Sequence, residues 1–191
     1  MTISADDDAT LIGRVRAGDT DAYAVLVRRH APMAMRTAVL LGAGSDAEDA
    51  VQEALVKAFR SLDRFHVDRP FRPWLLRIVA NEARNAHRSA VRRMAREERD
   101  ARDAQALSTW LDDPSVNVTD RQTKEQVLAA VERLPATQRR AVICRYLLEL
   151  DEAETAVVLG VPRGTVKSRL SRGLGRLRDD LGATIEEVDH A

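Results

Sequence analysis

The apolar residues of this chain recur with the period of an α-helix along most of its length. The clearest stripe follows i, i+3, i+4, i+7 spacing, which places its members on one face of a helix. It consists of Ala47, Ala50, Val51, Ala54, Leu55, Ala58, Phe59 and Leu62. No segment shows the alternation of a strand, and aromatic residues, which favour sheets, make up only 4% of the chain. The sequence therefore predicts an all-α fold.

Breaks in this period divide the chain into expected helices. Glu48 follows Ser45 at the spacing of a capping box, which predicts a helix start there. Pro70 and Pro73 predict a short loop. The expected helices begin at Leu11, near Tyr23 (ending near Gly42), at 46–59, at 74–93, near Gln122, at Val142, at 152–158 and at Arg163.

Charge is distributed in blocks although the formal net charge is zero. Residues 1–95 and 121–181 are mildly basic, whereas residues 96–120 and 182–191 are acidic. The acidic stretch 96–120 also loses the helical period and contains Pro114. We therefore expect two small helical domains, an N-terminal helical bundle (1–95) and a C-terminal domain (121–181), joined by a flexible acidic linker (96–120) and followed by an acidic tail (182–191).

Several functional classes find no support in the sequence. The only cysteine is Cys144, and the four histidines lack the spacing of metal ligands, so no metal site is predicted. No phosphate-binding or hydrolase motif occurs, which predicts no cofactor, no small-molecule substrate and no enzymatic activity. No apolar run reaches the roughly 18 residues of a membrane span, and the acidic N-terminus is unlike a signal peptide. We expect a cytoplasmic protein without membrane insertion.

Two short helices separated by Gly160 and Pro162 predict a helix-turn-helix. On the second helix, five apolar residues share one face: Val166, Leu170, Leu174, Leu177 and Leu181. Ser168 and Arg172 lie at the centre of the opposite face, and residues 163–178 carry six basic side chains and no acid. Such a helix suits the major groove of DNA. An ordinary surface helix with solvated arginines is the alternative.

The helix expected at 74–93 is also two-sided. Its apolar side carries Leu75, Ile78, Val79, Ala83 and Ala86, and its polar side carries Arg77, Asn81, Arg84 and Arg88. Arginines can follow phosphates, and an asparagine can contact a base edge. Phe71 and Trp74, if exposed, could stack on unpaired bases. The alternative is that Trp74 lies in the core and the arginines are solvated; for Trp74 itself we favour the core.

The segment LPATQRRAVICRYLLELDEAETAVVLGVPRGTVKSRLSRGLGRLRDDL (134–181) resembles the DNA-binding region of bacterial sigma factors of the extracytoplasmic-function group. The segments GDTDAYAVLVRRH, DAEDAVQEALVKAF and FRPWLLRIVANEARNAHR resemble, in this order, helices of the first domain of that family. The resemblance covers about residues 11–95 and 121–181. Thr155 departs from it, since the family usually has a larger aliphatic residue there.

The resemblance implies an alternative sigma factor whose partners are core RNA polymerase, promoter DNA and an anti-sigma factor. It places core binding on the polar face of the helix at 46–59, at Asp49, Gln52 and Glu53. It places recognition and melting of the minus-ten element on the helix at 74–93 and on the loop 65–73, with Asn81 contacting a flipped base. The residues expected there are Phe71, Trp74, Arg77, Asn81, Arg84, Asn85 and Arg88.

The minus-thirty-five element would be contacted by the last helix. The residues expected there are Arg163, Thr165, Lys167, Ser168, Arg169, Ser171 and Arg172, with Lys167 toward the flank of the exposed face. Two other functions stay open from the residues alone. A conventional helix-turn-helix regulator would explain the second domain only, and a helical adaptor protein would not explain the run without acids from Arg163 to Arg178.

Overall fold

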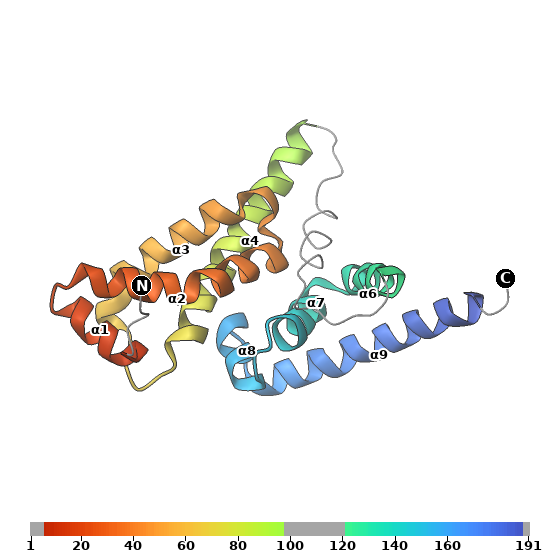
Figure 1. Cartoon of the computed structure of the whole chain (residues 1–191). Coiled ribbons are helices and arrows are strands. Elements are labelled where there is room, and N and C mark those ends of the chain that lie inside the picture. The colour runs from red at the N-terminus through yellow and green to blue at the C-terminus, as the bar shows by residue number, and fades with distance from the viewer. Residues whose placement is uncertain (1–5, 98–120, 189–191) are drawn as a thin grey trace. The chain divides into compact units, whose positions relative to one another are not determined.

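The computed structural model describes residues 6–97 and 121–188, which belong to two compact units divided between Asp100 and Ala101 (Figure 1). Every regular element in these two ranges is a helix, so the predicted all-α fold of two helical domains is confirmed. The expected linker falls almost wholly on residues 98–120, which lie outside the described ones. None of the described helices is both long and apolar enough to cross a membrane.

Within residues 6–97, the first unit contains four α-helices and three short helical turns. In chain order these are α1 (Asp8–Arg16), α2 (Thr20–Ala38), η1 (Val39–Ala43), η2 (Gly44–Asp46), α3 (Ala47–Ser61), η3 (Leu62–Arg64) and α4 (Phe71–Glu97). Asp7 caps α1 by accepting a hydrogen bond from the Thr10 amide at 2.8 Å. Asp19 caps α2 in the same way, through the amides of Asp21 and Ala22.

The core of this unit lies where α1, α2, α3 and the start of α4 meet. Its buried members are Leu11, Ile12, Ala22, Leu26, Ala58, Leu62, Phe65, Phe71 and Leu75. The Tyr23 hydroxyl donates to the Leu55 carbonyl at 2.5 Å and so ties α2 to α3. Burial of these apolar faces is the main force that assembles the bundle.

The structure corrects two expected helix starts. The capping box at Ser45 and Glu48 is absent, and the Ser45 hydroxyl instead donates to Asp46 at 3.3 Å. The turn η2 leads directly into α3, and the Ala47 amide is satisfied by the Gly44 carbonyl. Helix α4 begins at Phe71 and includes Pro73 in its first turn, where a proline costs no hydrogen bond because those amides have no partner within the helix.

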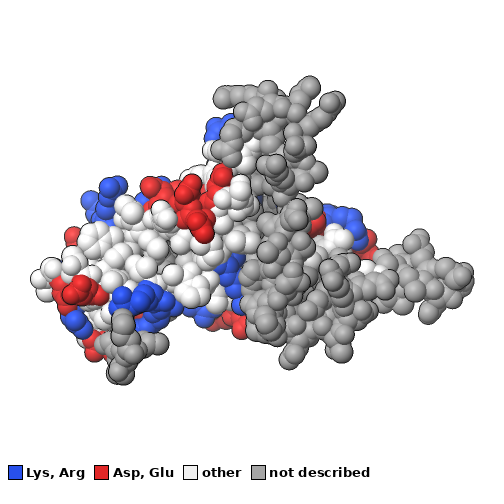
Figure 2. Space-filling view, turned by 45° about the horizontal axis from the view of Figure 1, so that its top comes forward, with Lys and Arg blue, Asp and Glu red and all other residues white. Residues whose placement is uncertain are grey.

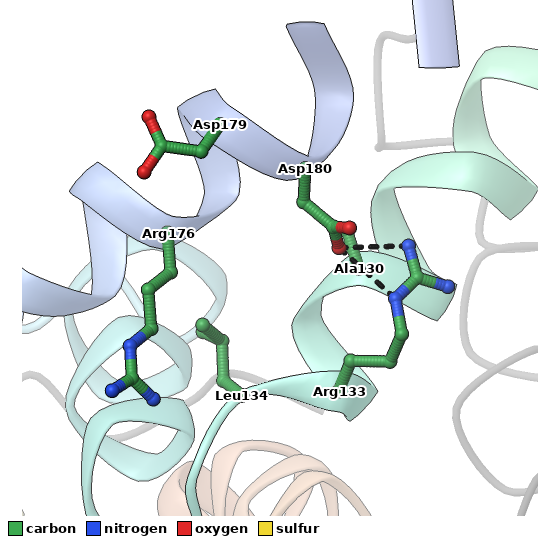
Figure 3. A pocket seen from close by; sticks show the side chains of 6 residues that line it. All are labelled: Ala130, Arg133, Leu134, Arg176, Asp179 and Asp180. Carbon is green, nitrogen blue, oxygen red and sulfur yellow. Dashed lines mark hydrogen bonds and ion pairs between the residues drawn. The ribbon is translucent and has the colours of Figure 1, made fainter. Parts of the chain in front are cut away.

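The second unit comprises α6 (Arg121–Arg133), α7 (Ala136–Val142), η4 (Ile143–Leu147), α8 (Glu152–Leu159) and α9 (Arg163–Val188). Helix α9 runs past Leu181, the last residue of the predicted apolar stripe. Before that point it packs beside α6, and both Nε and Nη2 of Arg133 donate to Asp180, at 3.0 and 2.8 Å (Figure 3). A hollow of about 400 Å³ lies there, over Ala130 and Leu134 (Figure 3).

Helices α7 and α9 approach each other closely at Gly173. A Cβ atom at this position would lie 3.1 Å from the Val142 side chain, so only glycine fits without a shift of the neighbour. Cys144 lies in the same core and is fully buried, as expected. Burial raises the pKa of its thiol to about 12, so the reactive thiolate is absent at neutral pH.

Candidate nucleic-acid interface

Helices α8 and α9 form the predicted helix-turn-helix, and local interactions define both ends of α8. Asp151 accepts hydrogen bonds from the amides of Ala153 and Glu154, and Glu154 accepts one from the Asp151 amide. The backbone hydrogen bond from Glu154, followed by that from Ala153, lowers the pKa of the Asp151 carboxyl. At the other end, Gly160 adopts the left-handed conformation (φ 66°, ψ 39°) that a residue with a side chain rarely occupies.

Backbone hydrogen bonds after Gly160 define the start of α9. The Val161 amide donates to the Ala156 carbonyl, and the amides of Thr165 and Val166 donate to the Pro162 carbonyl, which starts the next helix. Val166 is fully buried, so the first turn of α9 is fixed against α8. The residues that follow therefore present a defined face to solvent.

That face carries most of the residues predicted to contact DNA. Arg163, Lys167, Ser171 and Arg172 are exposed, whereas Thr165, Ser168 and Arg169 are half-buried. The Ser168 hydroxyl donates to the Thr165 carbonyl at 3.1 Å, so it points back along the helix. Lys167 and Arg172 are both exposed, and the expectation that Lys167 lies toward the flank of this face stays a prediction.

Helix α4 carries the second group of predicted residues. Arg77 and Arg88 are exposed, and Asn81 and Arg84 are half-buried between them. The Arg84 guanidinium donates to the side-chain oxygen of Asn81 and to the Ala80 carbonyl, the latter at 3.1 Å. These bonds fix both side chains on the surface of α4.

This face of α4 is electrostatically unsatisfied. Burial, followed by the positive charges of Arg88 and Arg77, lowers the pKa of Arg84. The three guanidinium groups therefore repel one another in the free protein. An anion placed over them would relieve that repulsion, and a row of phosphates is the anion that such a helix face fits best.

The aromatic residues at the start of α4 pack against the core, whereas side chains that stack on bases would be exposed. Phe71 is only 4% exposed, and its ring packs edge-on against His30 and Phe65. Trp74 is half-buried and packs against Phe65 and Phe71, with ring centroids 4.8 and 5.4 Å apart. Trp74 packs against the core, as favoured, and Phe71 is buried, so the exposure that stacking on bases would require is absent for Phe71.

A third group, predicted to bind polymerase, lies on α3. Asp49, Gln52 and Glu53 are all exposed, opposite the buried stripe. Asp49 and Glu53 border a hollow of about 310 Å³ between α3 and α4, into which they, Asp46 and Glu82 bring four carboxylates. Figure 2 shows such a gathering of acidic side chains on the surface of the first unit. Asn85 also lines this hollow, so the structure places it with the α3 residues.

Two residues of this face were not singled out from the sequence. Val56 and Phe59 are each 43% exposed and continue the face of Gln52 at i+4 and i+7. Phe59 was assigned to the buried stripe, but it stands at the edge of that stripe, and its ring packs edge-on against Tyr23. The spacing from Gln52 could have identified both. An exposed apolar pair beside a charged cluster is typical of a protein interface.

Lys57 links the two helices that border this hollow. Its ammonium group lies 2.7 Å from Glu82 on α4 and 3.2 Å from Glu53 on α3. The hydrogen bond with Glu82, above all, raises the pKa of Lys57. Lys57 therefore bridges one carboxylate of α3 and one of α4 across this hollow.

Comparisons with known proteins agree with this arrangement. The family described as Sigma-70 region 2 matches residues 26–93, and the family described as Sigma-70, region 4 matches residues 124–177. The ECF RNA polymerase sigma-E factor of Escherichia coli (strain K12) is 32% identical over 170 residues, covering 86% of this chain and 89% of the relative. The RNA polymerase sigma factor NccH of Alcaligenes xylosoxydans xylosoxydans is 32% identical over 179 residues, covering 93% and 95%.

Solved structures show the same similarity. CnrH, solved in complex with the cytosolic domain of CnrY, is 27% identical, with a TM-score of 0.68 and coverage of 93% of this chain and 99% of CnrH. The sigma factor RpoE from Bartonella quintana, solved in complex with the anti-sigma factor NepR, is 26% identical, with a TM-score of 0.56 and coverage of 82% and 94%.

Proposed function

Because the chain belongs to the extracytoplasmic-function sigma factors of RNA polymerase, we propose that its three exposed faces divide the work of promoter-specific initiation among them. As a member of this family, the chain is an alternative sigma factor that acts in transcription initiation. The assignment of each face to a partner is our proposal. The observation that carries it is the separation of an acidic face on α3 from basic faces on α4 and α9.

The α3 face would bind core polymerase. Asp49, Gln52 and Glu53 supply charge and hydrogen-bonding groups, and Val56 and Phe59 supply apolar area beside them. Apolar residues at the centre of such a face contribute most of the binding free energy, and the charges around them set orientation and association rate. Asn85, which lines the same hollow, would contact polymerase rather than DNA.

The two basic faces would contact the promoter. On α9, the exposed Arg163, Lys167, Ser171 and Arg172 would enter the major groove of the minus-thirty-five element, together with the half-buried Thr165, Ser168 and Arg169. On α4, Arg77, Arg84 and Arg88 would follow phosphates of the minus-ten element while Asn81 contacts a base. The segment 65–73 would border the flipped base, held in place by Phe71 and Trp74.

The remaining assignments follow from the family. The protein would be non-catalytic, would need no metal or cofactor, and would act in the cytoplasm on the polymerase found there. The relatives solved with CnrY and NepR indicate that a dedicated anti-sigma factor is a further partner of this chain. We place the two functional domains at 1–95 and 121–181, joined by the acidic stretch 96–120 and followed by the acidic tail 182–191.

Core binding offers the sharpest test of the α3 assignment. The triple variant D49A/Q52A/E53A should bind core polymerase at least tenfold more weakly while keeping the helix content of the parent, because these side chains lie outside the packed core. The variant D63A/D179A is the control, since it removes the same number of charges at exposed positions elsewhere. Equal affinities of the triple variant and the control would remove these residues from the interface.

A further inference from the structure

The segment between η3 and α4 presents a short exposed surface between two buried anchors. His66, Val67, Asp68, Arg69 and Pro70 are all exposed, whereas the flanking Phe65 and Phe71 are buried. The segment folds through one internal turn, in which the Arg69 amide donates to the His66 carbonyl at 3.0 Å. Its shape therefore depends on how its ends are held.

The aromatic core holds the side of the segment that faces inward. The Phe65 ring packs against Trp74 and Phe71, with centroids 4.8 and 5.7 Å apart. These contacts fix the Phe65 side chain but leave the direction of its backbone to other groups. That backbone direction determines where residues 66–70 point.

Arg16, the last residue of α1, holds the backbone. Its Nη2 donates to the Leu62 carbonyl at 2.8 Å and also to the Phe65 carbonyl, and its Nε donates to the Leu62 carbonyl at 3.2 Å. One guanidinium group thus binds the backbone at both ends of the turn 62–65, which directly precedes the segment 66–70. Charged donors form stronger hydrogen bonds than neutral ones, and the rigid fork of arginine fixes the angle between the two carbonyls.

The rest of α1 lies behind the segment as well. Asp8 and Ile12 of α1, with the capping residue Asp7, line a hollow of about 400 Å³ together with Asp68 and Arg69 of the segment. Helix α1 lies outside residues 26–93, which match the region 2 family. The segment is therefore supported by an element that the family match does not include.

We propose that Arg16 is a positioning residue for promoter recognition, which holds residues 66–70 in the geometry that discriminates among bases of the minus-ten element. This inference rests on the proposed role of the segment in promoter melting. A segment that is ordered before binding loses less conformational entropy when it binds, and it cannot shift to accommodate a wrong base. Loss of Arg16 should therefore reduce discrimination, whereas core binding and minus-thirty-five recognition should keep their parent values.

The test compares three variants of the full chain. Arg16→Ala removes all three hydrogen bonds, and Arg16→Lys keeps the charge but loses the fork. Arg14→Ala is the matched control, because Arg14 is exposed on the same helix end and pairs only with acidic side chains, at Asp6 and Asp19. Hydrogen exchange of residues 65–70 is measured in the free chain, and open complexes are counted on promoters that differ by one base in the minus-ten element.

Arg16→Ala should raise exchange in residues 65–70 and lower the ratio of open complexes between the best and the substituted promoter, each by roughly tenfold, the factor expected for losing a charged hydrogen bond. Arg16→Lys should be intermediate, and Arg14→Ala should match the parent. An equal loss of open complexes on every minus-ten sequence would overturn the inference, since it marks a merely structural role. Unchanged exchange in Arg16→Ala would overturn it too.

The two readouts also separate this inference from the proposed function. Raised exchange with unchanged base preference would show that Arg16 holds the segment but that the segment does not select bases, which overturns the positioning role. Full rescue by Arg16→Lys would mark Arg16 as a simple charge that contacts phosphate. Absence of core-dependent open complexes with the parent chain would contradict the proposed function, while the exchange measurement would still decide whether Arg16 holds the segment.

Discussion

The guanidinium group of Arg84 donates a hydrogen bond to the side-chain oxygen of Asn81, three residues earlier on the same face of α4. This bond occupies one lone pair of the Asn81 side-chain oxygen and leaves its NH2 group as a donor available to a ligand. The two residues therefore form one hydrogen-bonded unit, and in the proposed function a phosphate-binding group would orient a base-contacting group.

This unit predicts that Asn81→Ala and Arg84→Ala are not additive. Each single variant should impair formation of the open complex, and the double variant should cost less than the sum, with a coupling of about 0.5–3 kcal/mol. Permanganate footprints of the melted promoter measure the effect. Additive losses would show that the two side chains act independently, and equal footprints for Asn81→Ala and the parent would remove Asn81 from the base contact.

The outer arginines of α4 should act through charge alone. Arg77→Ala and Arg88→Ala should each reduce the slope of log affinity against log salt concentration by about 1, because each removes one phosphate contact. Arg14→Ala, whose parent side chain is already paired with Asp6 and Asp19, should leave the slope unchanged. A parent slope in the Arg77 and Arg88 variants would mean that these arginines are only solvated.

Arg172 and Lys167 should differ in kind although both are exposed on α9. Arg172→Ala should cost roughly 1–3 kcal/mol and relax preference at one base pair, because a guanidinium can pair with a guanine edge through two hydrogen bonds. Lys167→Ala should weaken binding about equally on all sequences. Binding to a library randomised in the minus-thirty-five element measures both, and a uniform loss for Arg172→Ala would make it a backbone contact.

Thr155 should weaken the second unit. It is fully buried on α8, and its hydroxyl has no hydrogen-bond partner among the described residues. Thr155→Val should therefore raise the free energy of unfolding by about 1 kcal/mol, because valine has nearly the same shape as threonine but lacks the buried hydroxyl.

Thr37 provides the control for this prediction. It is equally buried, but its hydroxyl donates to the Met33 carbonyl at 2.8 Å. Thr37→Val should not stabilise the first unit. Calorimetry of the two variants decides the matter, and destabilisation by Thr155→Val would show that its hydroxyl is satisfied in solution.

The sequence was sufficient for features that depend on local pattern. The stripes of Val166 and Leu170 on α9 and of Ala54 and Ala58 on α3 are buried as their period predicts, because each repeats along one helix. Gly160 and Pro162 likewise define the turn between α8 and α9, since the backbone preferences of glycine and proline do not depend on other parts of the chain.

Features that depend on other helices could not be predicted in this way. Phe71 is buried because Phe65 and His30 reach it from elsewhere in the chain. The contact of Arg16 with the carbonyls of Leu62 and Phe65 joins residues more than forty positions apart, and no period records it.

Reconstituted transcription tests most directly whether this chain confers promoter specificity on core polymerase. Core polymerase, promoter library and chain are combined, and transcripts are sequenced with each component left out in turn. We predict transcripts from a defined subset of promoters only when core polymerase and chain are both present, and loss of that subset with D49A/Q52A/E53A. Sequence-specific binding of the chain alone to duplex DNA, with no transcript initiated in the presence of core polymerase, would contradict the account and identify a conventional helix-turn-helix regulator.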